Sequence, residues 1–459
     1  MALDAERGSS QEVRDFVLRK SDEYLRWLEE ACSIPSMAGE PEALIEMAGW
    51  LGDKFDQLGA PNERLDLGEH PDAILAETGD GDRTVLVYDH YDVQPVDPIE
   101  LWESKPFSPE IRDGVFYARG AADNKGDLVA RLAALDVYRE VYGDLPLRMK
   151  FLVEGEEETG SKSFPELVTR YNSKLEADGC IWEGMGIDHV GRPELVFGAK
   201  GLAYVELNCK ALADDQHSSL AVVAPSAAWH LVEALATLRD PSGRVLIDGF
   251  YDDVEEPTEA DTELLEALPF EEEAERERLG VDKFVGDVSG IELLKRYYFE
   301  PTCNIAGIVA GFIVPGTSKT VLPKQAMAKL DMRLVPNQDP DKVVELLSKH
   351  LEARGYGDIT IDKFSMEHPV RSPADSSIGR AAIHAAREVF DHEPAISPMM
   401  IGTGPMYPVA ATLGIPTVSP AGVHRPDSNI HAPNENCRIE DFTRIIEYTV
   451  AWIRAFAEV

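Results

Sequence analysis

The spacing of apolar residues predicts alternating helices and strands in the first third of the chain. Helical periodicity covers residues 11–31 and 43–58. Two short apolar runs that end in polar loops, TVLVYD at 84–89 and LRMKFLVEG at 147–155, predict strands, and the helical stretch 124–142 lies between them. Because strands that alternate with helices are typical of parallel sheets, we expect a largely parallel α/β fold.

A different pattern begins near residue 201. Alternating apolar and polar positions there predict strands, separated by helical patterns, and together they indicate an inserted α+β unit. We therefore expect a discontinuous catalytic domain of residues 1–200 and 367–459, and an inserted domain of residues 201–366. The inserted unit has predicted strands at 204–210, 304–312, 325–335 and 358–364 and predicted helices at 224–238 and 340–355; the α/β pattern resumes with a helix at 379–390 and a strand at 414–420.

Composition narrows the classes of protein. A chain of 459 residues exceeds the size of one hydrophobic core, so two structural units are expected. With 44 Lys and Arg against 83 Asp and Glu, the net charge of −39 disfavours nucleic acid and membranes as partners. The acidity itself is most simply that of a solvated surface. Five scattered cysteines without a C-x-x-C pair, and no leader-like or membrane-length apolar segment, predict a cytoplasmic protein.

Residue types that bind metals gather in four loops. In an open α/β sheet, active sites lie beyond the carboxyl ends of the strands, where such loops converge. Adjacent buried carboxylates need cations to remain ionised, and histidines with carboxylates but no cysteine suit Zn²⁺, Mn²⁺ or Co²⁺. So many acids indicate two metal ions. The loops are YDHYDVQP with His90 and Asp92, GAADNKGD with Asp123, EGEEETGS with Glu156, Glu157 and Glu158, and SNIHAPNE with His431 and Glu435.

Five short motifs occur in an order that resembles a known family. They are H-x-D at 90–92, G-x-x-D-x-K-G at 120–126, E-E-T-G-S at 157–161, TSKTVLP followed by DMRLVPNQDP, and HAPNE at 431–435. Together they resemble the two-zinc exopeptidases and amidohydrolases that include carnosinase, cytosolic non-specific dipeptidase, glutamate carboxypeptidase, aminoacylase and succinyl-diaminopimelate desuccinylase. The resemblance is greatest to the dipeptidase branch. It implies that the inserted unit is a lid or dimerisation domain.

The resemblance also implies a set of metal ligands for two divalent ions, with Zn²⁺ the expected metal and Mn²⁺ or Co²⁺ as alternatives. Each ion would have three protein ligands, which leaves room for a shared water. The alternative ligand Asp188 lies deeper in its loop than Glu183. By the resemblance, Asp123 bridges both ions and is followed by a cis peptide, His90 and Glu183 complete one site, Glu158 and His431 complete the other, and Asp92 orients His90.

The remaining roles also come from the resemblance. Glu157 would be the general base that activates the shared water. His217 would stabilise the oxyanion from the partner subunit of a homodimer, and Arg333 would bind the substrate carboxylate. Thr320, Gly402 and Thr403 occupy positions at which relatives bind polar groups of the substrate.

The expected function is metal-dependent hydrolysis of a dipeptide or similar small amide with a free carboxylate. An N-acyl-amino-acid amidohydrolase, favoured by Glu183, remains an alternative, and a catalytically silent binding protein is a third. Two departures from the family pattern affect the site: Asp89 stands where Gly is common before the first histidine, and Gly402, Thr403 and Gly404 replace Gly-Gly-Ser. The loop before His90 is therefore expected to differ from that of relatives.

Overall fold

The computed structural model describes residues 2–459 and contains two compact units. Unit 1 consists of the chain up to Gly198 together with residues 372–398 and 405–459, and unit 2 consists of Ala199–Arg371 and Met399–Gly404. The short segment 399–404 was expected in the catalytic domain. It belongs to unit 2 because the backbone N–H of Lys200 donates to the carbonyls of Met400 and Gly402, and because Met399 packs with buried apolar residues of that unit.

Unit 1 is built on a six-stranded sheet with the order β1-β2-β6-β3-β7-β18. Strands β6, β3, β7 and β18 are parallel, and β1 and β2 add an antiparallel edge. Six of the seven residues of β3 are buried, as expected for a strand covered on both faces. The bounds are β1 (Asn62–Leu65), β2 (Ala73–Thr78), β3 (Thr84–His90), β6 (Arg148–Glu154), β7 (Gly179–Ile181) and β18 (Thr417–Val418).

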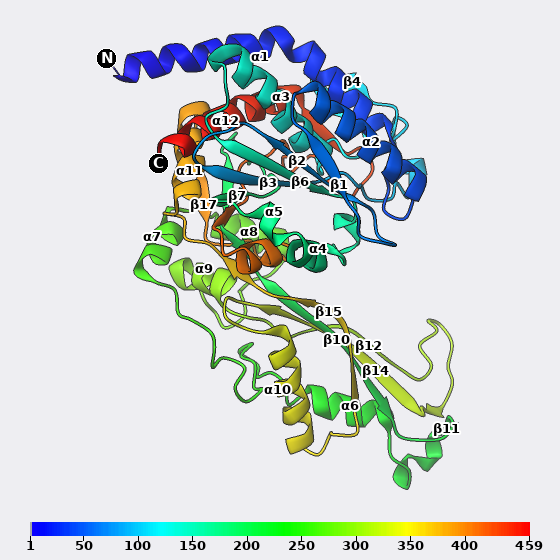
Figure 1. Ribbon diagram of the computed structural model, residues 1–459. Helices are drawn as coiled ribbons and strands as arrows, with labels where there is room; N and C mark the ends of the chain where they lie inside the picture. Colours follow the sequence, from blue (N-terminus) through cyan, green and yellow to red (C-terminus); the bar gives the residue numbers. More distant parts are fainter. Residues whose placement is uncertain (1) are drawn as a thin grey trace. The chain divides into compact units, whose positions relative to one another are not determined.

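Helices pack against this sheet, with α3 in contact with both α1 and α12 (Figure 1). The first helix starts nine residues before the predicted position, and α12 was not predicted at all. Yet the apolar residues of α12 recur every three or four positions from Phe442 to Phe456, a signal that could have revealed it. The helices of unit 1 are α1 (Ala2–Ser33), α2 (Pro41–Gln57), α3 (Lys125–Tyr142), α4 (Phe164–Arg170), α5 (Asn172–Leu175), α11 (Ser377–Val389) and α12 (Ile439–Glu458).

Smaller elements complete unit 1. A three-stranded sheet joins β4 (Glu110–Arg112), β5 (Val115–Tyr117) and β19 (Asn436–Arg438), and a parallel pair joins β8 (Glu194–Val196) and β17 (Ala395–Ser397). Short helical turns lie at η1 (Ile99–Leu101), η2 (Glu157–Thr159) and η4 (Pro408–Thr412).

Unit 2 is an antiparallel sheet with the order β12-β14-β10-β15. Residues of β10 alternate between buried and half-buried, so one face carries the core. Helix α6 contacts β10 and β14, and α10 contacts β10 and β15. The acidic segment 250–279 contains α7 and α8, and a small apolar cluster packs α7 against α9. The bounds are β10 (Gly201–Lys210), α6 (Ala227–Leu235), α7 (Glu259–Ala267), α8 (Glu272–Leu279), α9 (Gly290–Phe299), β12 (Asn304–Ala310), β14 (Gln325–Leu334), α10 (Pro340–Ala353) and β15 (Thr360–Glu367).

Two short strand pairs, β9 (Gly198–Ala199) with β16 (Val370–Arg371) and β11 (Gln216–His217) with β13 (Val321–Leu322), and the turn η3 (Ser218–Val222) complete the elements. The predicted α/β class, a mainly parallel sheet joined to an inserted α+β unit, is confirmed. Among residues 2–459, no helix is both long enough and apolar enough to cross a bilayer.

A buried ion pair supports the end of β3. The Asp89 carboxylate, which is fully buried, accepts a hydrogen bond of 2.7 Å from Arg131 Nη1. The same guanidinium donates to the carbonyls of Tyr88 at 2.9 Å and Trp182 at 2.7 Å, so it links the ends of two neighbouring strands. Burial raises the pKa of Asp89 to about 6, although Arg131 opposes the shift. Asp89, which stands where relatives commonly have glycine, is therefore balanced by the buried Arg131 guanidinium.

Removing one member of this pair should be costly. The substitution Asp89→Ala leaves the Arg131 guanidinium buried without a counter-ion, so we expect a loss of about 3–5 kcal/mol in the free energy of unfolding. Replacing both residues, as Asp89→Ala with Arg131→Met, should recover most of that loss, because neither charge of the pair then remains buried without the other. Urea unfolding of the wild type, the two single variants Asp89→Ala and Arg131→Met, and the double variant measures the coupling between the two residues. Strictly additive losses would contradict it.

Candidate metal centre

The parallel strands bring several acidic and histidine side chains to one edge of the sheet. His90 is the last residue of β3, which is flanked by β6 and β7. Strand β6 leads into η2, which begins with Glu157 and Glu158, and Glu183 follows β7 by two residues. Parallel strands end at the same edge of a sheet, so these loops are neighbours. Asp123 lies two residues before α3.

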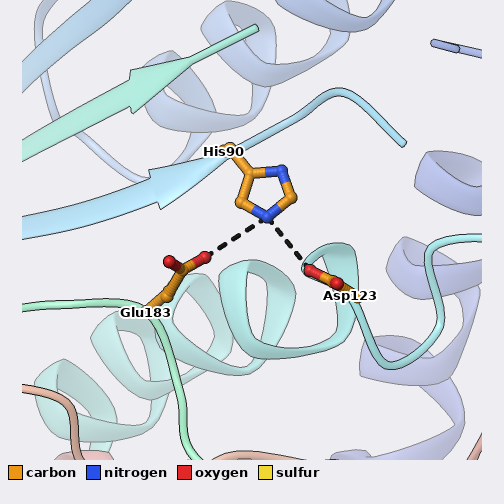
Figure 2. Close-up of side chains that lie close together, drawn as sticks. All are labelled: His90, Asp123 and Glu183. Carbon is orange, nitrogen blue, oxygen red and sulfur yellow. Dashed lines mark hydrogen bonds and ion pairs between the residues drawn. The ribbon is translucent and has the colours of Figure 1, made fainter. Parts of the chain in front are cut away.

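One group of three potential ligands consists of His90, Asp123 and Glu183. His90 Nε2 lies 3.1 Å from Asp123 Oδ1 and 3.3 Å from Glu183 Oε2. Figure 2 shows both carboxylates pointing at this nitrogen. One ligand atom from each residue lies within 4.8 Å of the others, which is close enough for one ion to reach all three.

A second group of three shares Asp123 with the first and adds Glu158 and His431. His431 Nε2 lies 3.0 Å from Asp123 Oδ2 and 3.1 Å from Glu158 Oε2. The two oxygens of Asp123 therefore face different histidines, with Oδ1 toward His90 and Oδ2 toward His431. A carboxylate in this position can bridge two cations.

The donor set fits divalent cations. Glu158 Oε1 is buried and accepts no hydrogen bond from any residue that the structure describes. Its other oxygen accepts a bond of 2.8 Å from Gln94 Nε2. The hydrogen bonds to Asp123 and Glu158 raise the pKa of His431 to about 10, which reflects how negative its surroundings are. An unpartnered buried carboxylate oxygen among further acids is the environment that a bound cation stabilises.

Glu157 belongs to the same cluster but to neither group of three. Burial raises the pKa of its carboxyl to about 9, and the negative charge of Glu183 adds to the shift. Positive charge nearby would lower this pKa. A carboxyl group that responds to its surroundings in this way is suited to accept and release a proton.

Asp92 connects the end of β3 to the turn that carries the glutamates. Its carboxylate is fully buried, and Oδ1 lies 3.3 Å from His90 Nδ1. The same carboxylate accepts the backbone N–H of Glu157 at 3.2 Å and of Glu158 at 3.0 Å. It can orient His90 and the η2 turn together.

Glu435 is a site residue whose role the sequence did not indicate. Its fully buried carboxylate accepts backbone N–H groups of Gly120 at 3.0 Å, Ala122 at 2.9 Å and Asp123 at 2.9 Å. It also accepts a bond of 2.6 Å from Arg119 Nη1. Although it occurs in a loop of metal-ligand types, it holds the loop before Asp123 in place. The predicted cis peptide between Asp123 and Asn124 is confirmed.

The alternative ligand Asp188 stabilises a turn instead. Its Oδ1 accepts the backbone N–H groups of Val190 and Arg192, each at 2.9 Å, and its Oδ2 lies 3.6 Å from the Arg192 guanidinium. These contacts satisfy the Asp188 carboxylate within its own loop, and the group around His90 contains Glu183.

The other five residues singled out from the sequence belong to unit 2. Arg333 lies near the end of β14, and its Nη1 donates to Thr403 Oγ1 at 2.6 Å. His217 is exposed and pairs with Val321, next to the exposed Thr320. Strand β14 separates these sites, because Gln325 and Arg333 lie about 26 Å apart at roughly 3.3 Å per residue. His217 and Thr320 thus lie together, far from Arg333, while Gly402 lies beside Thr403 in segment 399–404.

Comparison with known proteins places this arrangement in a family. Residues 86–455 match the model of peptidase family M20/M25/M40. The chain belongs to this family. The predicted relationship to metallopeptidases, and to their dipeptidase branch, is confirmed.

Individual relatives cover nearly the whole chain. It is 30% identical to Beta-Ala-His dipeptidase of Mus musculus over 89% of its own length and 87% of the relative. It is 26% identical to Cys-Gly metallodipeptidase dug1 of Schizosaccharomyces pombe, over 98% and 99% of the two chains. The crystal structure of an M20 family metallo-carboxypeptidase, Sso-CP2 from Sulfolobus solfataricus, superposes with a TM-score of 0.87 and 39% identity over 95% of this chain and all (100%) of that one.

The contacts of Glu435 lead to a prediction about metal binding. In Glu435→Gln, an amide N–H₂ must face backbone N–H donors, and Arg119 loses its counter-ion. We expect the free energy of unfolding to fall by about 3–5 kcal/mol and the metal affinity to fall about 10- to 100-fold, because the Asp123 loop is no longer held. Urea unfolding and competitive metal titration measure the two effects. The exposed Glu440→Gln is the control; equal effects of both variants would contradict the role of Glu435.

Proposed function

We propose that this protein is a two-metal dipeptidase that hydrolyses small peptides with a free carboxylate. The observation that carries the proposal is the pair of ligand groups that share Asp123. In this proposal His90, Asp123 and Glu183 hold one ion, and Asp123, Glu158 and His431 hold the other. Two divalent ions, for which Zn²⁺ is the expected metal, would supply Lewis acidity and lower the pKa of a water molecule.

Glu157 is the proposed general base. It is held beside the ligands by the turn that Asp92 organises, and it is not needed as a ligand itself. Its carboxylate would take a proton from the attacking water as the new bond forms between oxygen and the amide carbon. The same proton would then pass to the amine nitrogen as the bond between carbon and nitrogen breaks. Asp92 would act by orienting His90.

The substrate class follows from Arg333 and from the relatives. A guanidinium binds a carboxylate with two parallel hydrogen bonds, so Arg333 would select peptides with a free carboxyl terminus. The named relatives act on Beta-Ala-His and Cys-Gly, which are both dipeptides. Gly402 would contribute contacts to polar groups of the substrate, and Thr320, which lies beside His217, would do so from the partner subunit.

A carboxypeptidase is the second candidate. It is favoured by the similarity to the metallo-carboxypeptidase Sso-CP2, at 39% identity over nearly the full chain. A carboxypeptidase would also bind the terminal carboxylate, but it would accept a substrate whose amino terminus is extended or acylated. The amino end of the substrate therefore separates the two candidates.

A substrate panel tests the proposal. We expect the metal-loaded protein to cleave free dipeptides at least about tenfold faster than the same dipeptides with an acetylated amino terminus, measured as kcat/KM. The reverse preference would favour the carboxypeptidase. The variant Glu157→Ala should retain two metal ions per chain by elemental analysis while losing at least about 100-fold in kcat, and the exposed Glu166→Ala is its control. No cleavage of any dipeptide would overturn the proposal.

We further propose that the active form is a homodimer in which His217 serves the partner. A dipeptide spans only about 7 Å, whereas Arg333 and Gln325, which lies three residues after the strand that pairs with His217, are about 26 Å apart. One copy therefore could not present both side chains to the same substrate. Unit 2 also exposes large apolar side chains in the segment that follows His217, with Val222 at 89%, Val223 at 80% and Trp229 at 69% exposure. A surface of this kind suits association with a second copy.

Mixing two inactive variants tests this arrangement. In a dimer of one His217→Ala subunit and one Glu157→Ala subunit, one of the two sites would have both Glu157 and His217. Equal mixing after dissociation should then recover about a quarter of wild-type kcat, because half of the dimers are mixed. Activity assays with sedimentation analysis measure the outcome. No recovery in mixtures that contain mixed dimers would show that His217 acts within its own subunit or not at all.

A further inference from the structure

Two cationic side chains of unit 2 lie close together without a carboxylate partner. Lys200 is the residue before β10 and is 3% exposed. Arg333 lies on the neighbouring strand β14, where it pairs with Leu202 of β10. Lys200 Nζ donates to the backbone carbonyl of Glu300 at 2.7 Å. The carboxylate of Glu300 pairs with Arg296 instead, at 3.0 Å. Among the side chains that the structure describes, neither Lys200 nor Arg333 forms an ion pair within 4.0 Å.

Two neighbouring cations without a carboxylate partner are unusual in a chain with a net charge of −39. Burial lowers the pKa of Lys200 to about 8; the nearby Glu300 carboxylate opposes this shift, and the positive charge of Arg333 adds to it. A buried ammonium beside another cation is stabilised when an anion binds to both. The Lys200 ammonium has three N–H donors, so donors remain after the bond to Glu300.

The second feature is the way in which Arg333 is held. Thr403 Oγ1 accepts the hydrogen bond from Arg333 Nη1 and donates to the Gly201 carbonyl at 3.3 Å. Thr302 fixes the backbone of the same residue, since its Oγ1 accepts the Arg333 N–H at 3.0 Å and its own N–H donates to the Arg333 carbonyl at 2.9 Å. A guanidinium has five N–H groups, so those not used by Thr403 can meet a carboxylate.

Lys200 and Thr403 are themselves connected through segment 399–404. The backbone N–H of Lys200 lies 3.2 Å from the carbonyl of Met400 and 3.0 Å from that of Gly402, the residue before Thr403. The side chain of Lys200 therefore adds positive charge, while its backbone fixes the segment that holds Arg333. Hydrogen bonds through segment 399–404 therefore link Lys200, Thr403 and Arg333.

We propose that Lys200 is a second cationic group of the carboxylate receptor, and that Thr403 is a positioning residue for Arg333 rather than a contact of the substrate. The proposal rests on the proposed function, in that the carboxylate is the one carried by the peptide substrate. Lys200 determines specificity by adding charge, so that a free carboxylate is preferred over the neutral amide of the same size.

Binding measurements test the proposal without depending on turnover. In the Glu157→Ala background, calorimetry with alanyl-alanine and with alanyl-alanine amide gives Kd for the charged and the neutral ligand. The further substitution Lys200→Met should raise Kd about 10- to 100-fold for the acid and less than about threefold for the amide, as expected for the loss of one charged hydrogen bond. Lys210→Met, at the exposed end of β10, is the control and should change neither value.

Variants of the other residues separate a binding role from a structural one. Thr403→Val should weaken binding of the acid selectively, and Thr403→Ser, which keeps the hydroxyl, should restore it. Lys200→Arg should keep the preference for the acid, and this variant also serves if Lys200→Met does not fold. Equal changes for acid and amide in the Lys200 variants would overturn the proposal, because Lys200 would then only support the fold. The proposed function fails separately, if the wild type cleaves no dipeptide.

Discussion

The central constraint on this molecule is the repulsion among carboxylates gathered at the ends of parallel strands. Like charges that are buried together remain ionised only where hydrogen-bond donors or cations balance them. The buried carboxylates fall into two groups, according to what balances their negative charge. Glu435 and Asp92 receive backbone N–H groups, and Asp89 receives a guanidinium, so these three are balanced from within. Their role is to hold the loops in place. Asp123 and Glu158 instead face histidines, and one oxygen of Glu158 accepts no hydrogen bond from the described residues, which leaves charge for bound cations to balance.

Much of this centre could be predicted because its ligands occur in short motifs beside apolar strands. His90, Asp123, Glu158 and His431 each stand in a motif. Three of the ligands lie at or after strand ends: His90 ends β3, Glu158 lies in the turn after β6, and Glu183 follows β7. The supporting contacts were harder to predict. Glu435 accepts the N–H of Asp123 across 312 positions of sequence, and Arg131 meets Asp89 across 42. A backbone N–H has no sequence signature, so a carboxylate that accepts one looks the same in a sequence as a metal ligand.

The fold, like the site, could be predicted where the signal is local in the sequence, but not where it depends on contacts between distant residues. Strands and helices with a clear period were predicted close to their observed positions, for example α3 at Lys125–Tyr142 and β14 at Gln325–Leu334. Segment 399–404 was assigned to the wrong side of the domain boundary because nothing in Met399–Gly404 marks it locally. It joins unit 2 through hydrogen bonds to Lys200, a residue 200 positions earlier than Met400, and through the burial of Met399. Contacts of this kind depend on the tertiary fold.

Unit 2 contains a pair of cations without carboxylate partners among the described residues, although the chain as a whole is strongly acidic. A net charge of −39 repels a peptide carboxylate at long range. Such repulsion between exposed charges is screened within about 8 Å at physiological ionic strength, whereas buried groups are screened much less. Lys200 is almost fully buried and Arg333 is half-buried, so their attraction for a carboxylate would persist where the repulsion of the surface has faded. Two cations placed together without carboxylate partners can thus offset, at one point, an excess of acids spread over the whole surface.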